Sequence, residues 1–408
     1  MSFMGLEVGE TACRALVVSG SGTVLARAQR RYGSSSKPVE GQLDARLVWD
    51  AVRQVIVQAA DLARSDPISA LAIASPGDAI VALALSGQPL TPCILGSDVR
   101  GGGYLEQARE IIGAERWYDS TGRFGGPHSV INKLCWLRDH APGVYRETAR
   151  FCTLGGFVAY QLGVSSAIDR SQASATDLLD VDEADWSIEV LRASGLTLAK
   201  MPEVRPAGTP LGPVSSAVCR ELGLAGRPVA VLGADDLACT SLGVGVTHPG
   251  QALYYLGTSI YLVPLYEATP LRRLLYLRGL ETWQHLPVGM LTSPLRFEVG
   301  GNALGWFLDV LSPLERREAL RSGRNPYSVL LEEMPAEAVE PLIVPPNGDM
   351  PGAAIGVGID TTRGELVRAV LEGLALQTVC GQERLLEVGI PIAGYRVGGG
   401  GSRSGRWL

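Results

Sequence analysis

The N-terminal part of the chain alternates between short extended runs and glycine-containing turns. Residues 6–9, 14–19 and 23–27 have the pattern of short strands, and a Gly20-Ser21-Gly22 turn precedes the last of them. Residues 47–63 instead carry apolar side chains at helical spacing. Strands therefore precede a helix, and this order predicts a mixed α/β fold that opens with a β-meander.

The same alternation continues along the rest of the chain. Strands are predicted at 70–74, 80–85, 229–232, 252–256, 260–265 and 395–397, and helices at 104–112, 130–139, 157–162 and 363–387. A strand, a tight glycine turn and a second strand occur near residue 9 and again near residue 257, but the identity between the two halves is too low to establish a repeat. The turn at 247–250 separates the two rounds, so the predicted domains are 1–246 and 247–408.

Length and composition agree with two globular domains. At 408 residues the chain exceeds what one hydrophobic core usually supports. Its 46% hydrophobic and 19% charged residues supply enough apolar material for packed cores without a bias toward disorder. The 50 glycines predict many close backbone approaches, which suits a ligand that is gripped by main-chain N–H groups.

Charge and cysteine content argue against several classes of protein. The formal charge of −6 and the lack of a basic stripe argue against nucleic-acid binding and favour a small-molecule partner. The seven cysteines include no C-x-x-C pair, so neither disulfides nor zinc is predicted, and the cytoplasm is the expected location. No basic leader opens the chain and no uninterrupted apolar run reaches membrane-spanning length, so no membrane partner is expected.

Five motifs carry the candidate chemistry. They are 7–14 (EVGETACR), 75–78 (SPGD) with 98–100 (DVR), 233–236 (GADD), 256–259 (LGTS) with Gly300-Gly301 and Trp306, and 398–404 (GGGGSRS) with Trp407. Each alone is uninformative, because glycine turns are frequent in α/β proteins. In this order and spacing they resemble the FGGY family of carbohydrate kinases over nearly the whole chain. The resemblance implies two actin-like, RNase H-like ATPase domains with an interdomain cleft that binds ATP and a sugar or polyol.

The resemblance further implies that three glycine-containing turns bind the phosphates of ATP. They supply Gly9, Thr11 and Arg14 from the first motif, Gly257, Thr258 and Ser259 from the fourth, and Gly399, Gly400, Gly401 and Ser402 from the fifth. Glycine allows the backbone to approach a phosphate closely. Glu7 occupies the position of the family's aspartate and is the implied Mg²⁺-associated group, with a solvated edge-strand charge as the alternative. Glu10 replaces a threonine and adds a carboxylate that repels a polyphosphate unless Mg²⁺ lies between them.

Substrate contacts are implied at Asp78, Asp98 and Arg100. A carboxylate accepts hydroxyl hydrogens and an arginine donates to hydroxyl oxygens, which is the chemistry that a polyol requires. A surface ion pair is the alternative for Asp98 and Arg100. The tryptophan and asparagine that precede the D-x-R element in the family are Gly96 and Ser97 here, so the resemblance does not identify the substrate.

The catalytic base is implied at Asp236, which matches the spacing of the family's G-G-x-D element. Phosphoryl transfer needs a carboxylate that accepts the proton of the attacking hydroxyl. If Asp235 ends an extended segment, the two side chains point in opposite directions, so only one of them faces the substrate. Asp236 is the predicted base, Asp235 is the alternative, and a helix N-cap is the structural alternative for the pair.

The predicted function is transfer of the γ-phosphoryl group of ATP, with Mg²⁺, to a hydroxyl of a pentulose, a hexulose or a glycerol-like polyol; a homodimer is left open. Family members continue beyond the position of Leu408, so the C-terminal domain is expected to be incomplete. This feature, together with Glu7 and Glu10, leaves a catalytically impaired, actin-like sensor of a sugar or nucleotide as the main alternative. An actin-type ATPase that remodels protein partners is a third possibility, which the sugar-like segment from Asp78 to Arg100 disfavours.

Overall fold

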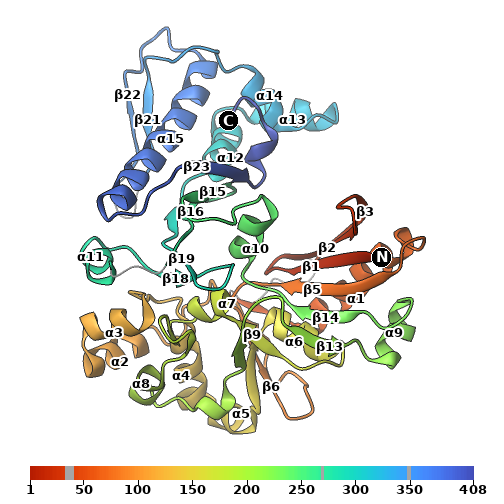
Figure 1. The fold of residues 1–408 in the computed structure, drawn as a ribbon. Coiled ribbons are helices and arrows are strands. Elements are labelled where there is room, and N and C mark those ends of the chain that lie inside the picture. The colour runs from red at the N-terminus through yellow and green to blue at the C-terminus, as the bar shows by residue number, and fades with distance from the viewer. Residues whose placement is uncertain (33–40, 268–270, 347–350) are drawn as a thin grey trace. The chain divides into compact units, whose positions relative to one another are not determined.

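The computed structural model describes residues 1–32, 41–267, 271–346 and 351–408, which form two compact units (Figure 1). The first unit contains Met1–Cys239 and Glu281–Gly289, and the second contains Thr240–Leu280 and Met290–Leu408. The chain first passes between them within helix α10 (Asp236–Gly243), rather than at the predicted turn 247–250. It also returns segment 281–289 to the first unit, whereas the sequence pattern placed this segment in the second domain.

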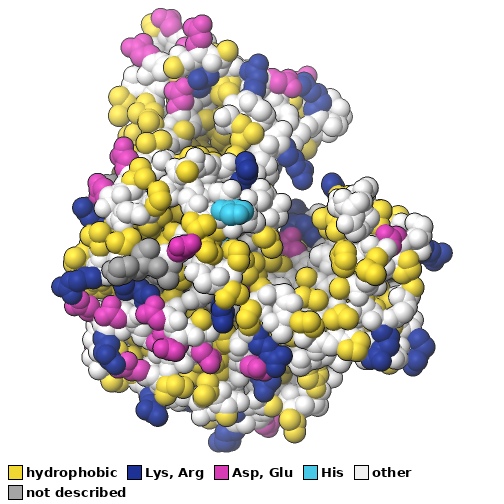
Figure 2. All heavy atoms as spheres, in the orientation of Figure 1, with side chains coloured by type: hydrophobic (Ala, Val, Ile, Leu, Met, Phe, Trp, Pro, Cys, Tyr) yellow, Lys and Arg dark blue, Asp and Glu magenta, His cyan; other side chains and the backbone are white. Residues whose placement is uncertain are grey.

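The surface carries both signs of charge. On the face drawn in Figure 2, basic and acidic side chains are interspersed with apolar ones. Among the residues that the structure describes, no helix has both the length and the apolar character that a bilayer crossing requires.

The first unit is built on a six-stranded mixed sheet in the order β13-β14-β5-β1-β2-β3. Strands β1 (Ser2–Val8), β2 (Ala12–Ser19) and β3 (Val24–Arg31) form the predicted antiparallel meander. Strand β5 (Ile68–Ala74) is parallel to β1, β14 (Val229–Leu232) is parallel to β5, and β13 (Pro210–Pro213) is antiparallel at the edge. Glu7 pairs with Ala74, and Ile73 pairs with Leu232. The carboxyl ends of β1, β5 and β14 therefore lie together, at the kind of sheet edge where α/β proteins bind ligands.

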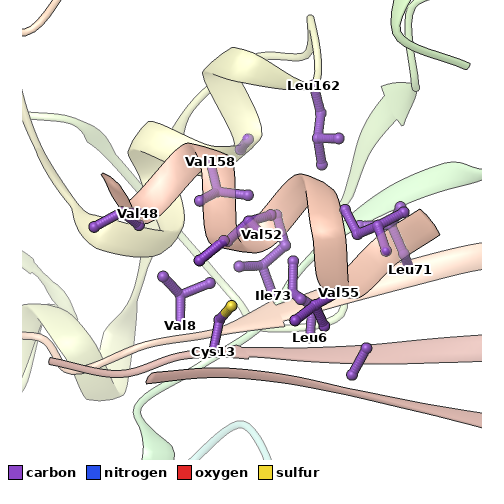
Figure 3. Close-up of a cluster of buried hydrophobic side chains, with 14 of the residues drawn as sticks. Leu6, Val8, Cys13, Val48, Val52, Val55, Leu71, Ile73, Val158 and Leu162 are labelled. Atoms are coloured by element: carbon purple, nitrogen blue, oxygen red, sulfur yellow. The ribbon is translucent and has the colours of Figure 1, made fainter. Parts of the chain in front are cut away.

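Helix α1 (Ala45–Leu62) packs on this sheet. It begins after Asp44, whose carboxylate accepts the N–H of Arg46 at 2.8 Å and caps the helix. The buried cluster between helix and strands contains Val48, Val52 and Val55 of α1, Leu6, Val8, Cys13, Leu71 and Ile73 of the strands, and Val158 and Leu162 (Figure 3). Burial of each such aliphatic side chain contributes about 1.5–3 kcal/mol, so this core fixes the strand ends that carry the candidate site.

A second core of the first unit surrounds helix α4 (Val130–His140) and a four-stranded sheet in the order β4-β7-β6-β8. Its strands are β4 (Gln42–Leu43), β7 (Cys93–Ile94), β6 (Ile80–Leu83) and β8 (Arg150–Thr153). The other elements of the unit are α2 (Tyr104–Ile112), α3 (Ala114–Thr121), α5 (Pro142–Glu147), α6 (Leu154–Gln161), β9 (Ala167–Asp169), α7 (Arg170–Ser174), β10 (Leu179–Asp180), β11 (Asp185–Trp186), α8 (Ile188–Ala193), the 3₁₀ turn Leu198–Lys200, β12 (Glu203–Arg205), α9 (Ser216–Leu222) and β18 (Trp283–Gln284).

The second unit contains a similar hairpin and parallel strand, in a four-stranded sheet of order β20-β16-β15-β23. Strands β15 (Gln251–Leu256) and β16 (Ile260–Pro264) are antiparallel, and β23 (Gly394–Gly398) runs parallel to β15. Tyr255 pairs with Gly398, so the turn after β15 and the glycine run after β23 leave the sheet at adjacent positions. The other elements are β17 (Tyr266–Glu267), α11 (Arg272–Leu277), β19 (Met290–Thr292), β20 (Leu295–Phe297), α12 (Gly301–Val310), α13 (Pro313–Arg321), α14 (Pro326–Glu332), β21 (Leu342–Val344), β22 (Ala353–Ile355), α15 (Arg363–Glu387) and the 3₁₀ turn Gly401–Arg403.

Candidate active site

Three strand ends of the first unit bring candidate residues together. Glu10 follows β1, Asp78 follows β5, and Asp236 follows β14. Burial is the main cause that raises the pKa of Asp236, and the charge of Asp78 raises it further. Burial also raises the pKa of Glu10, and both Asp78 and Asp236 add to that effect. The three carboxylates therefore form one acidic cluster at the sheet edge.

Asp235 and Asp236 stand at the start of α10. The N–H of Leu237 donates to Oδ1 of Asp236 at 2.8 Å and to Oδ1 of Asp235 at 3.1 Å. Asp235 is buried, and its own N–H donates to Oγ of Ser171 at 3.0 Å, whereas Asp236 is partly exposed. Burial is the main cause that raises the pKa of both carboxyls, more strongly for Asp235. Both carboxylates thus accept the N–H of Leu237 at the start of α10, the kind of contact that the N-cap alternative predicted. Asp236 is the more accessible of the two.

Asp98 and Arg100 form a bidentate ion pair. Nε of Arg100 donates to Oδ1 of Asp98 at 2.9 Å, and Nη2 donates to Oδ2 at 2.7 Å. The Asp98 and Arg100 side chains are 6% and 18% exposed, so this is not the solvated surface pair of the alternative. Burial opposes ionisation of Asp98, but the hydrogen bonds from Arg100 outweigh it and lower its pKa. The pair is a fixed charged element, and its contact with a substrate stays a prediction.

Lys133 is a residue of this site that the sequence analysis missed. It lies in α4 and is fully buried. Its Nζ donates to the carbonyl oxygens of Asp78 and Leu95, each at 2.8 Å, and of Gly96 at 3.4 Å. Burial lowers the pKa of Lys133, and the charges of Asp78 and Glu10 oppose that shift. The signal in the sequence was a lysine inside an apolar helical run, a residue type that is almost never fully buried without partners.

Glu10 is directed toward the substrate segment. Its Oε1 accepts the N–H of Gly96 at 2.5 Å. From the sequence, Glu10 was expected to be a repulsive group beside the phosphates. The structure instead connects it with the residue that stands where the family has tryptophan.

Glu7 and Arg14 pair with each other across β1 and β2, and Nη1 of Arg14 lies 2.6 Å from Oε1 of Glu7. Gly9 and the exposed Thr11 belong to the intervening turn, which is closed by the Gly9 N–H donating to Ala12 at 3.1 Å. Within the described ranges, no three His, Cys, Asp or Glu side chains are grouped as metal ligands. In nucleotide sites Mg²⁺ commonly takes most of its ligands from phosphate and water. Glu7 as a Mg²⁺ contact stays a prediction, and its carboxylate is already engaged by Arg14.

The second unit has a pocket of about 860 Å³ next to both of its glycine turns. Its lining includes Gly257, Thr258, Asn302, Tyr327, Gly400, Gly401 and Trp407. This volume lies within the range of small-molecule sites. The structure thus brings the fourth and fifth motifs to one pocket. The hydroxyls of Ser259 and Ser402 donate to the carbonyl oxygens of Glu298 and Gly399, at 3.4 and 2.7 Å.

Two glycines of the last loop are required by its path. Gly399 has a φ of +88°, and a Cβ there would lie 2.5 Å from the carbonyl oxygen of Leu256. A Cβ at Gly401 would lie 2.7 Å from the Trp407 ring and 2.8 Å from Cβ of Leu256. Only glycine fits both positions, and the loop backbone can therefore pass directly against the end of β15.

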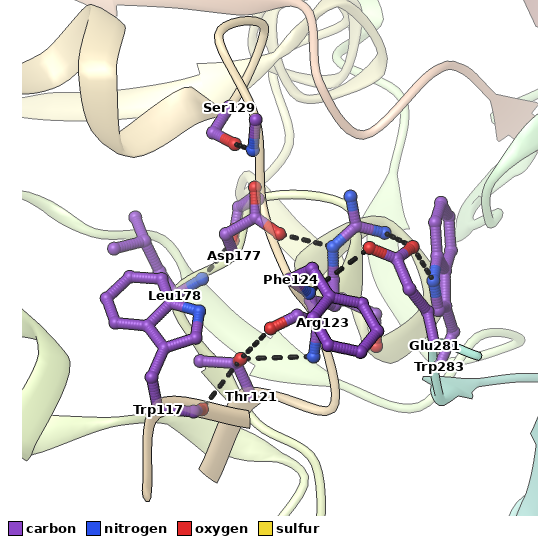
Figure 4. A network of polar contacts seen from close by, with 12 residues as sticks. Trp117, Thr121, Arg123, Phe124, Ser129, Asp177, Leu178, Glu281 and Trp283 are labelled. Atoms are coloured by element: carbon purple, nitrogen blue, oxygen red, sulfur yellow. Dashed lines mark hydrogen bonds and ion pairs between the residues drawn. The ribbon is translucent and has the colours of Figure 1, made fainter. Parts of the chain in front are cut away.

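A polar network holds segment 281–289 in the first unit (Figure 4). Arg123 forms an ion pair with Asp177 and a second one, at 3.3 Å, with Glu281. Its guanidinium lies 4.1 Å from the centre of the Trp283 ring. Nε1 of Trp283 and the N–H of Phe124 donate to the Glu281 carboxylate at 3.0 and 3.3 Å. These contacts join residues that are far apart in sequence, so the motif analysis did not detect them.

Comparison with known proteins assigns the chain to a family. The model of the FGGY family of carbohydrate kinases, N-terminal domain, matches residues 2–243. The gluconokinase of Bacillus subtilis (strain 168) is 24% identical over 422 residues, covering 99% of this chain and 81% of that protein. The autoinducer-2 kinase of Klebsiella pneumoniae is 27% identical over 441 residues, covering 100% and 80%. The crystal structure of xylulose kinase from Rhodospirillum rubrum superposes with a TM-score of 0.84 at 25% identity, covering 100% and 83%.

These matches define an enzyme with the two-domain, actin-like ATPase fold. The chain belongs to the FGGY family of carbohydrate kinases, because the family model covers more than half of it. The resemblance inferred from the five motifs is confirmed. Kinases of this family use ATP with Mg²⁺. The pocket of the second unit, which glycines of both turns line, has the volume of a small-molecule site.

Proposed function

We propose that this kinase phosphorylates a hydroxyl of a small sugar or polyol of the pentulose, hexulose or glycerol class. The observation that carries the proposal is the acidic cluster of Glu10, Asp78 and Asp236 at the ends of three neighbouring strands. The R. rubrum neighbour, named a xylulose kinase, supports the pentulose class, and the gluconokinase and autoinducer-2 kinase relatives support a small carbohydrate-like acceptor more generally. A cytoplasmic location and a homodimer stay predictions.

Asp236 is the proposed base. Its partly exposed carboxylate can take the proton of the acceptor hydroxyl, and a pKa raised by burial makes it a better acceptor. As the hydroxyl oxygen bonds to the γ-phosphorus, the bond from that phosphorus to the β–γ bridging oxygen breaks, and ADP leaves with the electron pair. Asp78 accepts hydrogen bonds from other hydroxyls of the acceptor, and the Asp98–Arg100 pair contributes further polar contacts.

The nucleotide is proposed to occupy the pocket of the second unit. Gly257, Thr258 and the loop Gly399–Ser402 would contact it through backbone N–H groups and short polar side chains. Gly9, Thr11 and Arg14 of the first unit are the proposed contacts from the other hairpin. Bound Mg²⁺ would neutralise charge on the phosphate oxygens during transfer.

A coupled ADP-release screen over pentuloses, hexuloses and polyols tests this function. We expect ADP release that depends on one class of acceptor, together with a singly phosphorylated product in mass spectrometry. Calorimetric binding of nucleotide without acceptor-dependent ADP release would contradict the proposal and favour the sensor alternative. ADP release that needs no acceptor would favour the ATPase alternative.

A further inference from the structure

Two carboxylates of the acidic cluster converge on a single glycine. Glu10 accepts the N–H of Gly96 at 2.5 Å, although these residues are 86 positions apart in the sequence. The Asp78 carboxylate lies against the α-carbon of the same residue, because a Cβ on Gly96 would overlap its Oδ2. A side chain at position 96 would therefore displace Asp78. The ends of β1 and β5 thus place two acidic groups on one short stretch of backbone.

Lys133 is a cation of this region, and its side chain is committed to the backbone. Its charge acts on Glu10, and the charges of Asp78 and Glu10 act on Lys133 in turn. An ammonium group has three hydrogens to donate, and Lys133 directs its Nζ at the three carbonyl oxygens of Asp78, Leu95 and Gly96. Because Lys133 is fully buried and bonded to these oxygens, its ammonium group cannot turn toward a bound ligand.

The two neighbouring arginines are committed to protein carboxylates. Arg100 uses Nε and Nη2 in its bidentate pair with Asp98. Arg123, whose charge also acts on Asp78, is held between Asp177 and Glu281 and stacks on Trp283 (Figure 4). Protein carboxylates balance both arginines. The single charge of Lys133 stands against the carboxylates of Glu10, Asp78 and Asp236, so the formal charge of these described groups together is negative.

We infer that Glu10 and Asp78 make this kinase selective for uncharged acceptors and exclude sugar acids. This inference rests on the proposed function. A neutral sugar donates its hydroxyl hydrogens to the two carboxylates, whereas the carboxylate of a sugar acid meets like charge. Among the described residues, the cations Lys133, Arg100 and Arg123 are already bonded to protein groups. Repulsion between the carboxylate of a bound sugar acid and those of Glu10 and Asp78, over the length of one small ligand, corresponds to a preference of about 10- to 100-fold in kcat/KM for the neutral acceptor. The B. subtilis relative is named for phosphorylation of a sugar acid, so the inference separates this chain from that activity.

Acceptor pairs that differ only in having a hydroxymethyl group or a carboxylate at C1 test the inference. We would measure kcat/KM of the full chain for D-glucitol against D-gluconate and for xylitol against D-xylonate. The wild type is expected to favour the neutral member of each pair by about 10- to 100-fold. Glu10→Gln keeps the side-chain shape and an oxygen for the Gly96 N–H, so it removes charge alone. It should lower the ratio of kcat/KM for the neutral acceptor to kcat/KM for the acid at least about fivefold. Asp78→Asn, which removes the charge of the other carboxylate, should lower the same ratio.

Glu110→Gln is the matched control, since it removes one exposed negative charge of α2 outside the cluster. It should leave the ratio unchanged, and thermal melts should show that all variants fold. A wild type that uses the acid as well as the neutral sugar overturns the inference. So does a ratio that neither Glu10→Gln nor Asp78→Asn changes.

Calorimetry separates this inference from the proposed function. The same acceptor pairs would be titrated into the wild type and Glu10→Gln, each saturated with a non-hydrolysable ATP analogue. If no acceptor supports ADP release, the proposed function fails, but tighter binding of the neutral member that weakens in Glu10→Gln still supports charge selection. Equal or tighter binding of the acid, or binding of neither, overturns it.

Discussion

The ammonium group of Lys133 donates to the carbonyl oxygen of Asp78 at 2.8 Å from a fully buried position. The same group bonds to the carbonyls of Leu95 and Gly96, which lead directly to Asp98. One side chain of α4 therefore fixes both segments that carry the proposed substrate contacts. Burial of a charge is costly unless hydrogen bonds compensate for it, and here three backbone acceptors do so.

Lys133→Met should weaken both the fold and the binding of the acceptor. Each buried carbonyl left without a donor costs about 1–3 kcal/mol, and relief of the buried charge offsets part of that, so we expect a loss of roughly 2–4 kcal/mol in the free energy of unfolding. Urea denaturation measures this loss. At a temperature where the variant stays folded, KM for the acceptor should rise while KM for ATP does not.

Lys200→Met is the control for the lysine. Lys200 is partly exposed and donates to the carbonyl oxygens of Arg146 and Thr148. Its loss should cost less stability and leave the KM for the acceptor unchanged. If Lys133→Met lowered stability without changing that KM, the positioning role would be wrong and only a structural one would remain.

Asp236→Asn should reduce kcat by about 10²- to 10⁴-fold, which is the usual contribution of a general base. Nucleotide affinity, measured by calorimetry, should be retained. Asp235→Asn should change kcat by no more than a few-fold, because Asp235 is buried and its carboxylate accepts the N–H of Leu237, a contact that the amide oxygen of asparagine can keep. The opposite order of effects would assign the base to Asp235.

The pH profile gives a second test of Asp236. Burial raises the pKa of its carboxyl above the ordinary value, and only the deprotonated form can accept a proton. The acidic limb of kcat/KM in the wild type should therefore lie above the pH at which an exposed aspartate titrates. A profile that stays flat down to pH 4 would contradict this assignment.

Several elements were predictable because their signals are local. The strand predicted at 229–232 and the helices predicted at 104–112 and 363–387 are β14, α2 and α15, with unchanged bounds. The helix predicted at 47–63 starts two residues earlier, since Asp44 caps it. Periodicity reports which face is buried, whereas a cap decides where the helix begins.

The geometry of the site depends on contacts over long sequence distances. The family resemblance indicated Asp78 and Asp236, but the sequence did not show the direction of Glu10, whose carboxylate accepts the N–H of Gly96. It also did not indicate that 281–289 joins the first unit, because this depends on bonds such as the N–H of Gln284 donating to Oγ of Ser174 at 3.0 Å. A motif reports residue types at a spacing, whereas partners of this kind follow only from the completed fold.

Asp169 should make stability depend on pH between about 4 and 6. It caps α7, yet burial dominates over the hydrogen bonds from Ser171 and Gln172 and raises the pKa of its carboxyl to about 6. In this window the folded protein keeps a proton on Asp169 that the unfolded chain has released. The contribution of Asp169 to the free energy of unfolding is therefore greatest below pH 4 and falls as pH rises.

The effect is measured as a difference between the wild type and Asp169→Asn. The variant cannot titrate at this position, so the wild type should lose up to about 3 kcal/mol relative to it between pH 4 and 7 in urea unfolding. A difference that is constant across this range would show that the Asp169 carboxyl titrates normally.

Gly399→Ala should impair nucleotide binding specifically. The residue has a φ of +88°, and its new Cβ would lie 2.5 Å from the carbonyl oxygen of Leu256, so the loop must move away from β15. We expect KM for ATP to rise at least about tenfold and the free energy of unfolding to fall by about 1–3 kcal/mol. Gly394→Ala in β23, the strand that leads into this loop, is the control, because its Cβ would meet nothing within 4 Å. Calorimetric titration of each variant with ATP and with the acceptor distinguishes the outcomes. The affinity for the acceptor should be unchanged in both variants. If Gly399→Ala bound ATP as tightly as Gly394→Ala, the nucleotide would have to lie elsewhere than against this loop.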